Sequence, residues 1–172
     1  MVEEVIVDRA FVKSSESAEV IADLSDIKPA VPHNVLNAMA AAGVALCLGV
    51  THPQITAGIR NFKLDHHRIE LVKTADGIDW IDDSKATNPH AAKAALGSFL
   101  SNIWIAGGLA KGAKMADLVA KSAPRIKAAI LIGTDRELIA VELAKTAPNV
   151  DANRIRLIAT PRWSGLAISV AA

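Results

Sequence analysis

The sequence predicts an α/β fold, in which short apolar strands alternate with helices. Downstream of residue 65, strand-like runs and helical segments follow one another along the chain. Of the 172 residues, 51% are hydrophobic and 22% are charged, which suffices for a packed core. The sequence period changes near residues 63–65, so we place a domain boundary there.

Elements before the boundary are expected to be short. A helix stop at Gly49 is followed by a helix start, in which Thr51 is the N-cap and Pro53 lies in the first turn. Cys47 is expected on a buried helix face. The expected elements are a strand pair at 5–7 and 11–12, a strand or helical turn at 19–24, and helices at 34–48 and 51–62.

Elements after the boundary begin with a β-hairpin, because Ala75-Asp76-Gly77 is a strong hairpin signal. The following alternation predicts a parallel sheet with helices on both faces. The expected strands are 68–73, 78–81, 103–106 and 128–132, with a candidate at 154–159, and the expected helices are 89–100, 115–122 and 135–147. Residues 160–172 show no recognisable element pattern.

Composition excludes several classes of protein. The formal charge is +1, from 19 basic and 18 acidic residues, and there are three Phe, three Trp and no Tyr. This balance gives no reason to expect a nucleic acid as partner. A single cysteine excludes an internal disulfide, and no apolar run is long enough to cross a membrane. The N-terminus does not resemble a signal peptide, so we expect a cytoplasmic protein without a membrane partner.

The loop Asp82-Asp83-Ser84-Lys85-Ala86-Thr87-Asn88 concentrates polar groups between a strand and a helix. An ionised Asp83 could accept hydrogen bonds from both hydroxyls of a ribose. Lys85 offers a positive charge to a phosphate or carboxylate, and Thr87 offers a short neutral donor. The alternative is a solvated turn in which Asn88 caps the next helix.

Three further groups are weighed in the same way. Asn34 and Asn37 lie three residues apart at a helix start, where their amides suit either a purine edge or plain capping by Asn34. Arg68 suits an oxyanion. His66 and His67 lack other ligands at a suitable spacing, apart from Asp65, so we expect no metal site there.

The run Gly107-Gly108-Leu109-Ala110-Lys111-Gly112 imitates a phosphate-binding loop. It fails as one because Ala113 stands where the motif G-x-x-x-x-G-K-[ST] requires lysine. The glycines would still let backbone amides approach an anion, and Lys111 adds a positive charge. The alternative is an ordinary strand-to-helix turn.

In their order along the chain, these motifs resemble the Mur ligases of peptidoglycan synthesis, over roughly residues 33–148. The resemblance rests on His33-Asn34-Val35-Leu36-Asn37, His67-Arg68-Ile69-Glu70, the 82–88 loop and the glycine run. It implies a Rossmann-like C-terminal ligase domain at 65–172, with a parallel-rich sheet covered by helices. Residues 1–64 would be the end of a central ATP-binding domain.

The resemblance also implies residue roles. Asn34 and Asn37 would contact adenine. Arg68 and Asp83 would contact the rest of the nucleotide, and Glu70 would orient Arg68. Lys85 would be catalytic. Thr87 and Lys111 would bind the acceptor amino acid, and Lys111 would hold the carboxylate of that amino acid. The implied reaction uses ATP and Mg²⁺ to join D-glutamate to UDP-N-acetylmuramoyl-L-alanine through an acyl phosphate.

Two departures limit this interpretation. The 172 residues contain no P-loop motif and no cluster expected to bind Mg²⁺, so we expect those parts in a region upstream and a truncated end beyond residue 160. We therefore expect this chain alone to be inactive and to bind ATP too weakly to saturate at millimolar concentration.

The alternatives are a fragment of another Mur ligase or a folylpolyglutamate synthetase-like enzyme, or a non-catalytic module that binds a nucleotide or a partner. The sequence does not indicate an oligomeric state.

Overall fold

The computed structural model describes residues 4–14, 16–109, 112–147 and 150, together with the backbone of 155–158 and 168–171. The chain divides into two compact units, unit 1 at Met1–Leu64 and unit 2 at Asp65–Ala172. Each unit has an apolar core of its own. None of the described helices is long and apolar enough to cross a membrane.

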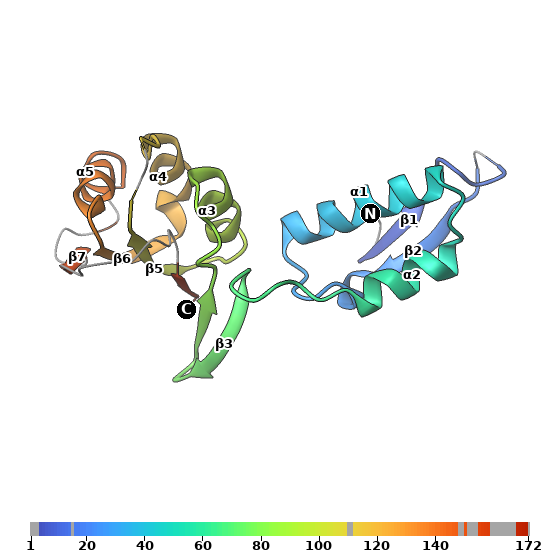
Figure 1. Ribbon diagram of the computed structural model, residues 1–172, viewed down its shortest axis with the longest axis horizontal. Helices are drawn as coiled ribbons and strands as arrows, with labels where there is room; N and C mark the ends of the chain where they lie inside the picture. The colour runs from blue at the N-terminus through green and yellow to red at the C-terminus, as the bar shows by residue number, and fades with distance from the viewer. Residues whose placement is uncertain are drawn as a thin grey trace. The chain divides into compact units, whose positions relative to one another are not determined.

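Unit 1 consists of a two-stranded antiparallel sheet and two helices (Figure 1). Its elements are β1 (Val5–Asp8), β2 (Glu19–Asp23), α1 (Pro32–Cys47) and α2 (His52–Asn61). Residues from both strands and both helices form the core, including Ile6, Ile21, Val35 and Ile55. Helix α2 begins as expected, with Thr51 as N-cap in a capping box with Gln54.

Two expectations for unit 1 were wrong. β1 pairs with β2, Val5 opposite Asp23, and not with residues 11–12. The carboxylate of Asp8 accepts hydrogen bonds from the backbone amides of Ala10 and Phe11, so the chain turns directly after β1. Cys47 is exposed and does not lie on the buried face of α1.

Unit 2 contains a six-stranded sheet with the strand order β3-β4-β8-β5-β6-β7. The β3–β4 hairpin turns at Asp76 and Gly77, which both have positive φ as the sequence suggested. Strands β5, β6 and β7 are parallel, whereas β8 runs antiparallel between β4 and β5. The strands are β3 (Glu70–Ala75), β4 (Ile78–Asp82), β5 (Asn102–Gly107), β6 (Ile126–Ile132), β7 (Ile155–Ile158) and β8 (Ile168–Ala171).

Three helices cover the sheet of unit 2. They are α3 (Pro89–Leu96), α4 (Ala116–Ser122) and α5 (Arg136–Thr146). Their side chains share one core with Trp104 on β5 and Leu131 on β6, so they lie on one face of the sheet (Figure 1). The α/β fold class is confirmed. The expected second helical layer is not found among the described residues.

Helix α3 shows why element ends depend on local chemistry. The Asn88 side chain accepts a hydrogen bond from the amide of Ala91 at 2.9 Å, which caps the helix, and Pro89 occupies its first position. We expected this helix to continue to Leu100, but it ends at Leu96 with Gly97 as C-cap. Strand β4 and helix α3 therefore hold the loop of residues 83–88 from both sides.

Candidate functional site

Asp83 lies at the start of this loop and is buried, with 7% of its surface exposed. Its Oδ1 accepts a hydrogen bond of 3.1 Å from the backbone amide of Ile69. Burial raises the pKa of Asp83 to about 6, the Ile69 hydrogen bond opposes this shift, and the neighbouring charge of Asp82 adds to it. Asp83 is thus a desolvated carboxylate, a kind of group that is concentrated at functional sites.

The segment that contains Ile69, the backbone partner of Asp83, has an unusual conformation. Ile69 has a φ of 46° and His67 a φ of 66°, both in the left-handed region, which β-branched residues rarely adopt. The amide of His67 donates to Glu70 Oε2 at 2.8 Å, and its carbonyl accepts from the amide of Lys85 at 3.1 Å. Hydrogen bonds therefore hold the segment 65–70 against the loop.

Lys85 and Arg68 meet at a single carboxylate oxygen. Lys85 Nζ lies 3.1 Å from Asp65 Oδ2, and Arg68 Nε lies 3.8 Å from the same atom. All three side chains are largely exposed. The fold therefore brings together the two cations that the sequence analysis singled out, and it holds them around an anionic oxygen.

Glu70 does not pair with Arg68 as the sequence analysis expected. Its carboxylate accepts from the amide of His67 and lies 2.9 Å from Nδ1 of His66. His67 Nδ1 lies 2.7 Å from Asp82 Oδ2. His67, Glu70 and Asp82 each offer a ligand atom, and these atoms lie within 4.8 Å of one another. Spacing along the chain does not predict this group, because His67 and Asp82 lie 15 residues apart; the hairpin register is the signal that brings them together.

Thr87 and Lys111 are the remaining predicted site residues of unit 2. Thr87 is exposed, directly before the Asn88 cap. Lys111 lies outside the described residues.

The glycine run serves close packing. A Cβ at Gly107 would lie 1.7 Å from the carbonyl oxygen of Ile132, and a Cβ at Gly133 would lie 2.6 Å from the amide nitrogen of Gly108. The amide of Gly108 itself donates to the carbonyl of Ile132. These glycines let the loops after β5 and β6 touch, and the Gly108 amide is occupied rather than open to an anion.

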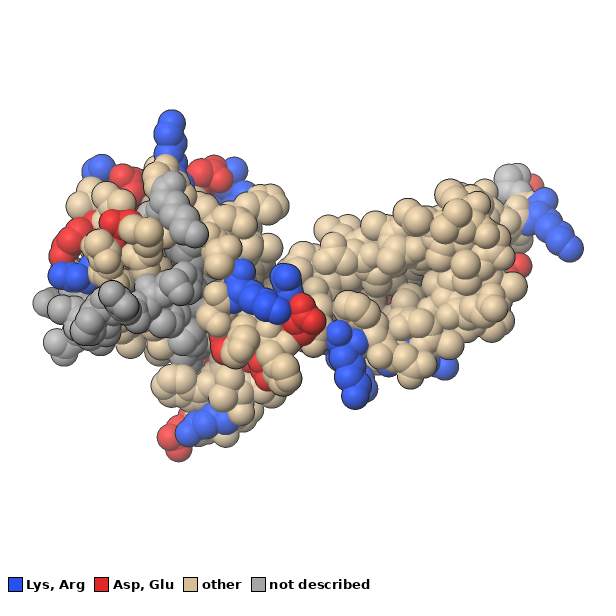
Figure 2. Space-filling model, viewed as in Figure 1, with Lys and Arg blue, Asp and Glu red and all other residues tan. Residues whose placement is uncertain are grey.

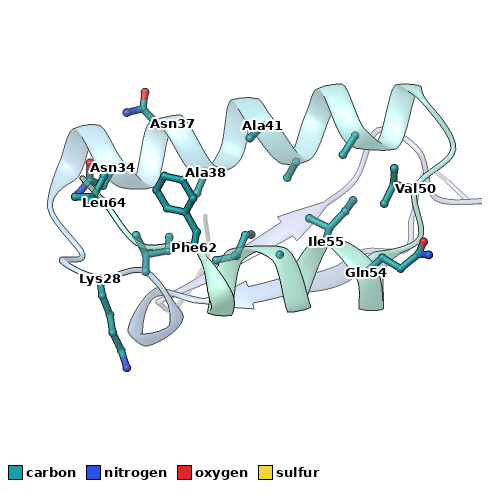
Figure 3. A pocket seen from close by; sticks show the side chains of 15 residues that line it. Lys28, Asn34, Asn37, Ala38, Ala41, Val50, Gln54, Ile55, Phe62 and Leu64 are labelled. Carbon is teal, nitrogen blue, oxygen red and sulfur yellow. The ribbon is translucent and has the colours of Figure 1, made fainter. Parts of the chain in front are cut away.

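Asn34 and Asn37 belong to unit 1. Both line a pocket of about 460 Å³ between α1 and α2, whose other lining residues are mostly small or apolar (Figure 3). Asn34 is buried and donates from Nδ2 to the carbonyl of Pro29 at 3.0 Å, whereas Asn37 is exposed. Asn34 is not the N-cap, because α1 begins earlier, with Val31 as N-cap and Pro32 at the first position.

Charge is distributed differently on the two units in the same view. The middle of the visible face of unit 1 is free of charged side chains, which lie at its ends and lower edge, while lysine, arginine and acidic side chains are interspersed on unit 2 (Figure 2). On the faces drawn in this view, the described residues form no one-sided basic patch of the kind typical of nucleic-acid binding.

Comparisons with known proteins agree with these motifs. The family model described as "Mur ligase, glutamate ligase domain" matches residues 67–165. UDP-N-acetylmuramoylalanine--D-glutamate ligase of Streptomyces avermitilis is 50% identical over 151 residues, covering 87% of this chain and 32% of that protein. The enzyme of the same name from Thermobifida fusca is 47% identical, with the same coverage.

Among solved structures, MurF from Acinetobacter baumannii matches with a TM-score of 0.58 and 22% identity, over 84% of this chain and 30% of that one. This likeness supports the fold alone. The chain spans about a third of the length of the curated relatives it matches. Because the family model matches more than half of its residues, the chain belongs to the Mur ligase family and contains that family's glutamate ligase domain.

Proposed function

We propose that this chain is part of an ATP-dependent amide ligase that joins D-glutamate to UDP-N-acetylmuramoyl-L-alanine in peptidoglycan synthesis. The observation that supports it most is the 50% identity to a relative named for this reaction. The site geometry is compatible, because a buried carboxylate and two cations gather at one strand-to-helix loop. The proposal includes ATP and Mg²⁺ as cofactors and a cytoplasmic location, where ATP is available.

The proposed roles follow from the chemistry of each side chain. Asp83 would accept hydrogen bonds from the ribose hydroxyls, and Arg68 would contact the nucleotide beside it. Lys85 would neutralise charge on the transferring phosphoryl group, and Thr87 would donate to the acceptor amino acid. In unit 1, Asn34 and Asn37 would contact adenine. Lys111 would hold the carboxylate of D-glutamate, and residues 1–64 would be the end of the ATP-binding domain.

The reaction would proceed in two displacements. A carboxylate oxygen of UDP-N-acetylmuramoyl-L-alanine attacks the γ-phosphorus of ATP, so ADP leaves and an acyl phosphate forms. The amine of D-glutamate then attacks the acyl carbon, phosphate leaves, and the nitrogen loses a proton. Both steps accumulate negative charge on phosphoryl oxygens, so fixed cations and correct positioning account for most of the catalysis.

Asp65 has a place in this scheme. Lys85 must leave Asp65 to reach a phosphate, and Asp65 and Lys85 are both well exposed. An exposed ion pair of this kind contributes little to stability, because water screens the attraction and both side chains lose freedom when they pair. A nucleotide phosphate can therefore replace the carboxylate of Asp65 at small cost.

The test is a chimera in which these residues replace the matching segment of the Streptomyces avermitilis relative. ADP release is measured with UDP-N-acetylmuramoyl-L-alanine and Mg-ATP, with and without D-glutamate. We expect strict dependence on D-glutamate. Lys85→Ala should lower kcat by roughly 100-fold or more, as expected when a group that stabilises transition-state charge is lost.

Lys93→Ala is the matched control, because Lys93 lies on α3 and pairs with Asp117 on the surface. It should leave kcat unchanged. ADP release that requires another acceptor amino acid would assign the chain to another Mur ligase or a folylpolyglutamate synthetase-like enzyme. A folded chimera without acceptor-dependent release would favour a non-catalytic module.

We further propose that the 172-residue chain binds ATP too weakly to saturate at millimolar concentration. Its sequence contains no P-loop motif, so no dedicated loop holds the phosphates. Isothermal titration with ATP and Mg²⁺ measures this directly. Saturation at micromolar concentration would refute it.

A further inference from the structure

Two carboxylates oppose each other at the open end of the β3–β4 hairpin. Glu70 is the direct partner of Asp82 in the antiparallel ladder, so both side chains leave the same face of the sheet. Like charges in directly opposed positions destabilise a strand pair. Each acid already has a histidine beside it, with His66 Nδ1 2.9 Å from Glu70 Oε1 and His67 Nδ1 2.7 Å from Asp82 Oδ2. A bound cation would add to this compensation, and the register alone, independent of any side-chain hydrogen bond, places the two acids together.

His67 adds an imidazole to this pair. One ligand atom from each of His67, Glu70 and Asp82 lies within 4.8 Å of the other two. Ligand atoms about 2.1 Å from a zinc ion lie ~3.4 Å apart in tetrahedral geometry. Small rotations of exposed side chains are therefore enough to close the three atoms around an ion.

We propose that His67, Glu70 and Asp82 bind a divalent transition-metal ion. Imidazole favours zinc and its neighbours in the first transition row, whereas Mg²⁺ prefers oxygen ligands alone. The side chains of His67 and Asp82 are 56% and 22% exposed, so an ion can enter from solvent and keep water at its remaining positions. This site is separate from the Mg²⁺ of the proposed ligase reaction and does not depend on that proposal.

The position of the ion gives it a structural consequence. Asp82 is the last residue of β4 and directly precedes Asp83, while His67 lies in the segment whose backbone binds the amide of Lys85. The ion would connect these two stretches of chain. It would therefore brace the loop of residues 83–88 and stabilise unit 2, because it binds the folded chain and has no assembled site in the unfolded one.

The experiment is a zinc titration of the full 172-residue chain without a histidine tag, by calorimetry and by thermal unfolding. A Cys47→Ser background is used, because the exposed thiol of Cys47 can itself bind zinc. We expect saturable binding of one ion per chain and a higher Tm. Asp82→Asn should weaken zinc at least ~10-fold, since losing a ligand costs no less than losing an outer-shell partner.

His67→Asn is the second variant, because asparagine tolerates the left-handed backbone of this position and so keeps the fold. It should weaken zinc to a similar extent and should alter the visible absorption of bound Co²⁺, which reports the imidazole ligand. His90→Asn, an exposed histidine on α3, is the control and should leave both readouts unchanged. The proposal is overturned by the absence of saturable zinc binding. Equal affinity in the parent, His67→Asn and Asp82→Asn chains overturns it as well.

Discussion

Asp83 makes the chain less stable at neutral pH. Its pKa is raised to about 6 by burial, above the value of 3.8 for a free aspartate. Well below pH 3.8 the carboxyl is protonated in both the folded and the unfolded chain. As the pH rises from 4 to 6 the unfolded chain ionises first, so the free energy of unfolding falls across this range. We expect Asp83→Asn to raise stability at pH 8 by at most about 3 kcal/mol, at ~1.4 kcal/mol per pKa unit, and to have little effect at pH 4.

This prediction is checked by urea unfolding of the parent and Asp83→Asn chains at pH 4 and pH 8, in EDTA so that no metal ion contributes. Asp76→Asn is the control, because Asp76 is an exposed turn residue with a φ of 54° that asparagine also accepts. Its effect at the two pH values is the reference for the effect of removing a carboxylate from the surface. A gain from Asp83→Asn that does not depend on pH would contradict the role of burial.

A residue that lowers stability while occupying a conspicuous loop is typical of a binding site. The sequence suggested Asp83 by its type and its position between a strand and a helix. It could not reveal the burial, because the partner at Ile69 lies 14 residues away and adopts a backbone conformation that its residue type does not predict. Residue type and position thus identified Asp83 as a candidate site residue, whereas its burial and its raised pKa follow only from the fold.

At the scale of elements, local signals predicted local structure well. The Asp76-Gly77 turn, the Asn88 cap and the Thr51 cap all depend on hydrogen bonds or dihedrals within a few residues, and all three are found. For the Gly107-Gly108 run, the sequence left both an anion-binding loop and an ordinary strand-to-helix turn open, because the deciding contact is not local. Its glycines are needed because another loop, after β6, packs against them.

The glycine loops allow a test that separates backbone strain from steric overlap. Gly107 and Gly77 both have positive φ, but only a Cβ at Gly107 meets other atoms, with Ile132 O at 1.7 Å. Gly77→Ala should therefore cost ~1–2 kcal/mol, the strain of the left-handed conformation. Gly107→Ala should cost about 3 kcal/mol or more, because overlap is added to strain.

Urea unfolding of the two variants measures this difference, with circular dichroism to confirm that both fold. Gly43→Ala serves as a second control, since it lies in α1 with open space and no positive φ. It should stabilise unit 1 by up to ~1 kcal/mol. Equal losses for Gly107→Ala and Gly77→Ala would show that the loops after β5 and β6 can separate without cost.

At the scale of the whole molecule, the sequence predicted the α/β class but not the complete sheet. Strand β8 lies in residues 160–172, where no element pattern was recognised, yet it occupies the middle of the sheet. Its partners β4 and β5 are far away in sequence, and such pairing leaves no periodic signal in a short segment. The same limitation hid the meeting of Lys85 with Asp65 and of His67 with Asp82.

The position of β8 leads to a prediction for the sheet of unit 2. β8 is the strand that joins the β3–β4 hairpin to the parallel strands, with Val170 opposite Trp80 on one side and Ile103 on the other. Proline cannot donate to a ladder and is excluded from central strands. Val170→Pro should therefore detach the hairpin, and with it the loop that presents Asp83, while β5 and β6 keep their own parallel pairing.

Hydrogen exchange should then accelerate in β4 and remain slow in β6. Val170→Thr, which keeps the backbone amide, should exchange like the parent in both strands. Slow exchange of β4 in the proline variant would mean that the hairpin holds its place without β8, and the site loop would then owe its position to β3, β4 and α3 alone.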